Sequence, residues 1–124
     1  MLDNLITFQK YSNVDFDFND NLRIKDSLMF IKCSNFNINI NSKINKITIK
    51  NCSNFNLTYF DTISGIDIDK SNEITIRRIY KDNTDLNLNY INCFMSKVKF
   101  CFDNLIELLD VKFINENSEI VFES

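Results

Sequence analysis

Apolar and polar residues alternate along this chain in short bursts, as in Phe36-Asn37-Ile38-Asn39-Ile40. Period-two alternation over a few residues is typical of short strands that bury one face. The bursts that show it are Val14–Phe18, Phe36–Ile40, Ile47–Ile49, Phe55–Tyr59, Ile66–Ile68, Ile74–Ile76, Leu86–Tyr90 and Val98–Phe102. Helical spacing is nearly absent, and only Leu105–Leu109 is spaced for a turn of helix. The pattern therefore predicts an all-β protein built from short strands.

The bursts recur at a fixed interval. The segment CSNFN occurs at residues 33–37 and again, nineteen residues later, at residues 52–56. Two apolar registers advance by nineteen or twenty residues: Leu28, Ile47, Ile66 and Leu86 in one, and Phe36, Phe55 and Ile74 in the other. Cys33, Cys52 and Ser71 occupy the corner between these registers. A short fixed period of this kind predicts a solenoid whose chain completes one coil in each period.

Two kinds of solenoid fit this period. Residues 44–55 read INKITIKNCSNF and match the leucine-rich-repeat pattern LxxLxLxxCxxL, as do residues 63–74. However, nineteen residues lie just below the usual length of that repeat. The return segment FNLTYF also alternates like a strand, where that repeat usually has a helix. We therefore predict a right-handed parallel β-helix with coils of about nineteen residues, and keep a short leucine-rich-repeat-like solenoid as the alternative.

Stacking of successive coils makes specific predictions about side chains. Parallel strands lie about 4.8 Å apart, so equivalent residues of neighbouring coils lie on top of one another. We expect Phe36 to stack on Phe55 in the interior, and Cys33, Cys52 and Ser71 to form a column of small side chains at a tight corner.

The whole chain, residues 1–124, is predicted to be one domain with its coils at about residues 8–110. Two apolar bursts, 111–114 and 120–122, surround the polar residues 115–118 near the end of the chain. This arrangement predicts a C-terminal β-hairpin at about residues 111–123. The ends of a stack of strands need protection, so the hairpin would cap the stack or pair with a second chain.

Composition and charge restrict the classes of partner and the cellular compartment that we expect. The chain has 44% hydrophobic and 25% charged residues, typical of a soluble globular protein. Its net charge of −3 and isoelectric point near 4.9 weigh against nucleic acid or an anionic membrane as the main partner. The chain shows neither an apolar run of membrane-spanning length nor a secretory signal pattern, so we expect it in the cytoplasm.

The residues offer little for chemistry. Histidine is absent, and the four cysteines (Cys33, Cys52, Cys93 and Cys101) are scattered without a CxxC pair. We therefore expect buried free thiols and neither a metal site nor a cofactor. No acid–base or nucleophilic constellation is present, and the single glycine, Gly65, cannot make a phosphate-binding loop. The chain is predicted to be a binding module rather than an enzyme.

One stretch is suited to binding another protein. If Ile47 and Ile49 point inward, Thr48 and Lys50 point outward. Lys43 and Lys46 flank them, so the face carries a local basic cluster within an acidic protein. This cluster would dock an acidic partner. The alternative is that these lysines only keep exposed strands from aggregating.

Residues 43–76 resemble the C-terminal domain of the cyclase-associated proteins, which regulate actin monomers. The resemblance extends over about residues 28–95. The residues that carry it are Lys43, Ile44, Asn45, Ile47, Thr48, Ile49, Asn51 and Cys52, followed by Phe60, Asp61, Ile66, Ile68, Ser71, Ile74 and Ile76. It implies a right-handed β-helix that forms a homodimer through a C-terminal hairpin. It also implies binding of actin monomers, preferably in the ADP form, and promotion of nucleotide exchange.

The same superfamily includes tubulin cofactor C, in which an arginine of a Gln-x-Arg-x-His motif stimulates GTP hydrolysis. The nearest segment here is residues 75–79, TIRRI, which has Arg77 but lacks both the Gln and the His. Three hypotheses follow: an actin-binding module, a structural or protein-interaction solenoid without actin binding, and a GTPase activator. The candidate binding residues are Lys43, Asn45, Lys46, Thr48, Lys50 and Arg77.

Overall fold

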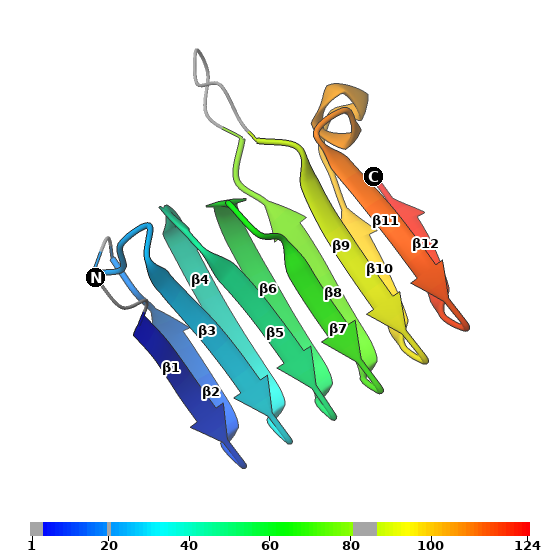
Figure 1. The fold of residues 1–124 in the computed structure, drawn as a ribbon. Helices are drawn as coiled ribbons and strands as arrows, with labels where there is room; N and C mark the ends of the chain where they lie inside the picture. Colours follow the sequence, from blue (N-terminus) through cyan, green and yellow to red (C-terminus); the bar gives the residue numbers. More distant parts are fainter. Residues whose placement is uncertain (1–3, 20, 81–86) are drawn as a thin grey trace.

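The computed structural model describes residues 4–19, 21–80 and 87–124, and its strands form a two-sided solenoid (Figure 1). Sheet A contains, in spatial order, β1 (Asn4–Gln9), β3 (Asp26–Ile31), β5 (Lys46–Lys50), β7 (Ile66–Asp69), β9 (Asn89–Phe94) and β11 (Val111–Glu116). Sheet B contains β12 (Glu119–Glu123), β10 (Lys97–Cys101), β8 (Asn72–Arg78), β6 (Ser53–Thr62), β4 (Ser34–Ile44) and β2 (Ser12–Asp17).

All neighbouring strands within each sheet are parallel, and the chain crosses from one sheet to the other after every strand. Both sides of each coil are therefore strands, and the predicted parallel β-helix is confirmed over the leucine-rich-repeat alternative. The single helical element in the described residues is a 3₁₀ turn, Leu105–Leu108, where a turn of helix was expected.

The nineteen-residue register is confirmed in the middle of the stack. Leu28 lies beside Ile47 and Ile47 beside Ile66 in sheet A. The prediction that Leu86 follows Ile66 in this register is wrong, because Ile66 pairs with Ile91, twenty-five residues later. Leu86 lies outside the described residues. The segment between the end of β8 at Arg78 and the start of β9 at Asn89 makes this coil longer than nineteen residues.

The core consists of the inward residues of alternating positions. Phe36 and Phe55 are 1% and 0% exposed, and their rings stack at 5.1 Å with an interplanar angle of 5°. Phe30 of sheet A packs edge-on against both rings, at 5.4 and 5.0 Å. The predicted interior stack is therefore confirmed, and its third aromatic comes from the opposite sheet.

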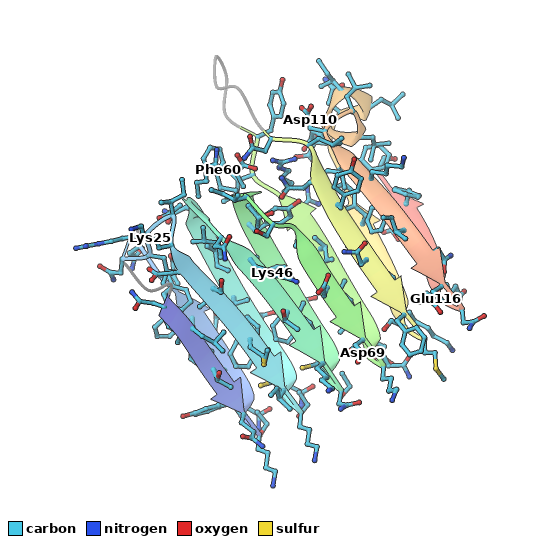
Figure 2. The ribbon with its side chains drawn as sticks, in the orientation of Figure 1. Lys25, Lys46, Phe60, Asp69, Asp110 and Glu116 are labelled. Carbon is cyan, nitrogen blue, oxygen red and sulfur yellow. The ribbon has the colours of Figure 1, made fainter. Side chains whose placement is uncertain are left out.

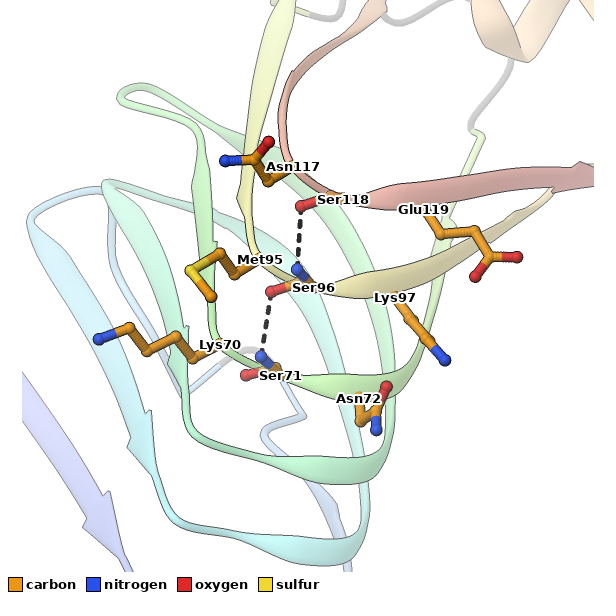
Figure 3. A pocket seen from close by; sticks show the side chains of 9 residues that line it. All are labelled: Lys70, Ser71, Asn72, Met95, Ser96, Lys97, Asn117, Ser118 and Glu119. Atoms are coloured by element: carbon orange, nitrogen blue, oxygen red, sulfur yellow. Dashed lines mark hydrogen bonds between the residues drawn. The ribbon is translucent and has the colours of Figure 1, made fainter.

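A column of small polar side chains runs along the corner where sheet A passes to sheet B. The backbone N–H of Cys33 donates to Sγ of Cys52 at 3.4 Å, and that of Cys52 donates to Oγ of Ser71 at 3.0 Å. The column continues from Ser71 to Ser96 at 3.0 Å and from Ser96 to Ser118 at 2.9 Å (Figure 3). The predicted Cys–Cys–Ser column is confirmed and extends over two further coils. We call these five residues the corner ladder.

Each corner residue also bonds back to its own turn. The Ser71 hydroxyl donates to the carbonyl of Asp69 at 3.0 Å, and the Ser96 hydroxyl to that of Phe94 at 2.8 Å. The residue before each corner adopts the left-handed conformation, with φ between 47° and 55°: Lys32, Asn51, Lys70, Met95 and Asn117. A side chain normally makes this conformation unfavourable by about 1 kcal/mol or more. The two hydrogen bonds at each corner offset that cost.

The repeated CSNFN encodes this corner. Its cysteine joins the corner ladder, and its first asparagine, Asn35 or Asn54, supplies a second left-handed residue. The amide Nδ2 of Asn54 donates to Oδ1 of Asn35 at 2.5 Å. Its phenylalanine then enters the interior stack. One five-residue segment therefore specifies the turn, the contact to the next coil and the first core residue of sheet B.

The predicted C-terminal β-hairpin is wrong. The strands lie where the apolar bursts placed them, but β11 pairs with β9 in sheet A and β12 pairs with β10 in sheet B, both in parallel. The polar turn between them is another solenoid corner, with Asn117 left-handed and Ser118 in the corner ladder. A polar turn between two apolar bursts has the same sequence pattern in both structures, which explains the error.

The Ser71→Ala variant tests the corner ladder. It leaves the buried N–H of Cys52 without its acceptor, and we expect the free energy of unfolding to fall by about 1–3 kcal/mol. Urea unfolding followed by circular dichroism measures this. Ser53→Ala, at an exposed position one residue from Cys52, is the matched control and should change stability by less than about 0.5 kcal/mol. Equal effects of the two substitutions would show that the ladder does not stabilise the fold.

Candidate functional site

The candidate binding stretch forms strand β5 in the middle of sheet A. Ile47 and Ile49 are fully buried, so Lys46, Thr48 and Lys50 project from the outer face of the sheet. Figure 2 shows Lys46 on the central part of this face. The predicted orientation of the strand is therefore correct, and these three candidate residues lie on one surface.

The neighbouring strand β7 places two carboxylates beside this stretch. Asp67 lies next to Thr48, and Asp69 lies next to Lys50. Nζ of Lys46 forms an ion pair with Oδ2 of Asp67 at 2.8 Å, and both side chains are a little over one-third exposed. The outer face of sheet A therefore carries both signs of charge, not the basic cluster that the lysines alone indicated.

A shallow depression lies on this face. Its polar lining comes from Thr48, Lys50, Asp67, Asp69, Asn92 and Glu116, and its apolar lining includes Met29, Phe94 and Ile114. The amide of Asn92 donates to Asp67 at 2.9 Å and fixes that carboxylate. One carboxylate oxygen of Asp69, Oδ1, has no hydrogen-bond partner and almost no exposed area. Apolar area and charges of both signs are thus combined in one concave surface.

Lys43 has a partner inside the protein. It lies near the end of β4, and its Nζ is 3.6 Å from Oδ2 of Asp61, a carboxylate that is only 2% exposed. Oδ1 of Asp61 also accepts the Nη2 group of Arg78 at 2.7 Å, and Arg78 is 4% exposed. An unpaired buried carboxylate is unfavourable, so Lys43 and Arg78 stabilise the fold by neutralising the charge of Asp61.

The buried Arg78 was missed by the sequence reasoning. Its guanidinium donates to the carbonyls of Phe60 at 2.9 Å, Asp110 at 2.8 Å and Asn87 at 3.1 Å, and it lies 5.6 Å from the ring centre of Tyr59. These contacts link three successive coils at the base of the long connection between β8 and β9. A signal was present, since Arg78 continues the inward alternation of Ile74 and Ile76 and lies nineteen residues after Tyr59.

Asn45 is occupied within the fold. Its Nδ2 donates to the Ser27 hydroxyl at 2.9 Å, and its Oδ1 accepts the Ser64 hydroxyl at 2.9 Å. The side chain thus connects three coils at the corner opposite the corner ladder.

Arg77 lies on the other side of the molecule. It projects from β8 in sheet B, where its Nη1 is 3.1 Å from Oδ1 of Asp103, and both side chains are exposed.

The six candidate residues therefore divide into three groups. Lys46, Thr48 and Lys50 share the outer face of sheet A, Lys43 and Asn45 contact internal partners, and Arg77 is on sheet B.

The cysteines are free thiols. Cys33, Cys52 and Cys93 are buried and Cys101 is half-buried. Across residues 4–19, 21–80 and 87–124, no three His, Cys, Asp or Glu side chains are grouped so as to hold a metal ion. Within the same residues, no helix is long and apolar enough to cross a membrane.

Comparison with known proteins identifies the family. The family model described as "Adenylate cyclase associated (CAP) C terminal" matches residues 5–99. The chain belongs to this family. The match covers most of the coils, including β5, β7 and the corner ladder as far as Ser96. It ends before the last coil.

A solved structure supports the fold of the CAP C-terminal family. The crystal structure of the cyclase-associated protein from Cryptosporidium parvum is similar, with a TM-score of 0.52 and 19% sequence identity. The match covers 98% of this chain and 60% of that chain, so this chain spans less than two-thirds of its length. At this identity the likeness shows a shared fold. A search of curated protein sequences found no significant match.

Burial of the thiols gives stability a pH dependence. Burial raises the pKa of Cys52 from 9.0 to about 11 and that of Cys93 from 9.0 to about 12. Well below pH 9 both thiols are protonated in the folded and unfolded chains. As the pH rises from 9 towards 11, the unfolded chain loses these protons first, so we expect the free energy of unfolding to fall. Urea unfolding at a series of pH values measures the slope.

The Cys93→Ala variant is the control for this prediction. It removes one of the shifted thiols and should make the fall between pH 9 and pH 11 shallower, whatever its effect on stability at pH 7. An unchanged slope would mean that Cys93 titrates equally in both states and is not buried as described.

Proposed function

We propose that this domain binds actin monomers, prefers their ADP form and promotes exchange of their nucleotide. The observation that carries the proposal is the family match over residues 5–99, since C-terminal domains of this family bind actin monomers. In this role the domain is a non-catalytic binding module of the cytoplasm. Actin holds and exchanges the nucleotide, and the domain contributes only binding energy.

We assign the contact with actin to the outer face of sheet A around Lys50. In the described part of the chain, Lys50 forms no ion pair, whereas Lys46 is paired with Asp67. The charge of Lys50 is therefore available to an acidic partner. Met29 and Phe94 provide the neighbouring apolar area. Protein interfaces combine an apolar centre with charges that set orientation and specificity, and this face offers both.

The Lys50→Glu variant tests the surface. Reversing this charge replaces an attraction with a repulsion, and we expect the affinity for ADP-actin to fall by about tenfold or more. A fluorescence titration of labelled monomeric actin, in the ADP and ATP forms, measures it. Lys70→Glu makes the same charge change at an exposed corner and should leave the affinity unchanged. If wild type binds and both variants bind as tightly, the contact lies elsewhere.

We also propose that the protein forms a homodimer through its last coil. Within the described residues, the strands β11 and β12 each have a neighbouring strand on one side only. Phe113 and Phe122 pack edge-on at 5.3 Å, and Phe122 is 50% exposed. Two open strand edges around an apolar end favour pairing with another chain, and a second copy is the partner expected from the family. The last coil would thus form the dimer interface that was expected of a C-terminal hairpin.

The Phe122→Glu variant tests the dimer. A carboxylate at this end should shift the protein to monomer in sedimentation velocity experiments at micromolar concentration, because its burial without a partner is unfavourable. Ile63→Glu, which is 52% exposed in the turn between β6 and β7, is the matched control and should remain dimeric. A wild-type protein that is already monomeric would refute the proposal.

A second candidate function is a protein-interaction solenoid that does not bind actin. The ion pairs of Lys43 and Lys46 favour it, because they remove two of the three lysines from the basic cluster that suggested an acidic partner. Absence of actin binding at tens of micromolar would support this second candidate, and affinity capture would then identify the partner.

GTPase activation is a third candidate, and it depends on Arg77. Arg77 is exposed and its ion pair with Asp103 is a weak surface contact, but residues 75–79 lack the Gln and the His that accompany the catalytic arginine in that motif. We expect no stimulation of GTP hydrolysis by tubulin and no difference between wild type and Arg77→Ala in a phosphate-release assay. A large loss of stimulated rate in that variant would establish the arginine finger.

A further inference from the structure

The N-terminal end of the solenoid has two open strand edges. β1 and β2 are the outermost strands of sheets A and B, and each pairs on one side only, with β3 and β4 respectively (Figure 1). The outer side of each strand therefore presents backbone N–H and C=O groups with no strand beside them in the part of the chain that the structure describes. Such an edge binds an added strand through main-chain hydrogen bonds.

The inward side chains at this end lack the cover that their neighbours have. Phe16 is 45% exposed, whereas Ile38, its partner in the next coil, is 3% exposed. Val14 is half-buried, whereas its partner Phe36 is 1% exposed. One more strand with apolar residues at alternate positions would bury these side chains.

The outward side chains of β2 define the charge of that strand. Asp15 and Asp17 project from sheet B and are both exposed, and no lysine or arginine is paired with either in the described residues. The same positions in the next coil are Asn37 and Asn39, and the amide of Asn39 donates to Asp17 at 3.4 Å. A strand added beyond β2 would place its outward residues directly next to these two carboxylates, and cations there would be favourable.

We infer that the N-terminal end of the solenoid binds an extended segment of a partner protein, in which basic and aliphatic residues alternate, as an added strand beside β2. The backbone edge supplies hydrogen bonds, Val14 and Phe16 accept the aliphatic side chains, and Asp15 and Asp17 accept the basic ones. This inference is independent of actin binding, which we assign to the outer face of sheet A.

Charge argues against a second copy of this chain at the same place. The column that contains Asp17 ends at the opposite end of the stack in Glu123, so stacking copies head to tail would place two carboxylates together. Pairing two N-terminal ends would bring the aspartates of both copies together. In addition, Tyr11 occupies the corner of the first coil, at the position that Cys33 has in the next coil. A second copy stacked here would have to continue the corner ladder past this large side chain. Like charges in neighbouring strands are unfavourable and select against these contacts.

Short synthetic peptides test the inference directly. The probe is an N-acetylated, C-amidated peptide of sequence KVKVKVK, and its binding to the full chain is measured by isothermal titration calorimetry. The same complex is examined by hydrogen–deuterium exchange of the protein. We expect saturable binding and added protection of residues 12–17. The peptide EVEVEVE should not bind, and KVKVKVK methylated at alternate backbone nitrogens should lose most of its affinity.

A protein variant and its control separate this site from general attraction to an acidic protein. Asp15→Asn with Asp17→Asn reproduces the residues of the next coil, so the fold should be retained. Its affinity for KVKVKVK should fall by about tenfold or more. Glu73→Gln with Asp110→Asn removes the same charge elsewhere and should bind like wild type. Unchanged affinity of the first variant, full affinity of the methylated peptide, or protection confined to residues 111–123 would overturn the inference.

Discussion

The corner ladder is the interaction on which the rest of this solenoid depends. At a corner the chain leaves one sheet before it enters the other, and the N–H groups of the corner residues lose their regular carbonyl partners, while the N–H groups on either side still donate to carbonyls of neighbouring coils. The Cys and Ser side chains replace those partners, because the thiol or hydroxyl of each coil accepts the N–H of the coil before it. Every buried backbone donor must be satisfied, so a coil shifted by one residue would lose this bond and expose its apolar face.

The fixed register determines what the surfaces present. Because equivalent residues of successive coils are neighbours, Lys50 lies beside Asp69 and Thr48 beside Asp67. The outer face of sheet A thus has charges of both signs beside apolar side chains, a combination that gives specificity more than strength. The two ends of the stack differ from this face, since in the described residues their strands pair on one side only and their inward side chains are incompletely covered. The candidate interaction surfaces are therefore the middle of one sheet and the two ends, for different physical reasons.

The period of the sequence predicts the parts of the fold where every coil has the same length. It places Phe36 on Phe55 and Cys33 beside Cys52 correctly, because these coils are nineteen residues long. It fails after Ile66, where the next coil is longer and the true neighbour is Ile91. The last corner looks like a hairpin turn in the sequence, because both need a polar residue that tolerates the left-handed conformation.

The charge of the candidate binding face was predicted less well than the fold. Along their own strand, the lysines of β5 and its flanks form a basic cluster. The same nineteen-residue period, applied to outward residues, leads from Lys50 to Asp69 and would have indicated a face with charges of both signs. The ion pair of Lys43 with Asp61 was harder to foresee, since a register shift between Ile40 and Lys43 makes Asp61, eighteen residues later, the neighbour of Lys43.

Native-state hydrogen exchange of the corner amides tests the central claim most directly. The N–H groups of Cys52, Ser71 and Ser96 donate to side chains of the next coil and not to a strand. If the corner ladder holds the coils in register, these three amides should exchange only through global unfolding, as slowly as the amides of β5 and β6. Exchange of the corner amides at the rate of exposed turn residues, while the strands remain protected, would contradict the account.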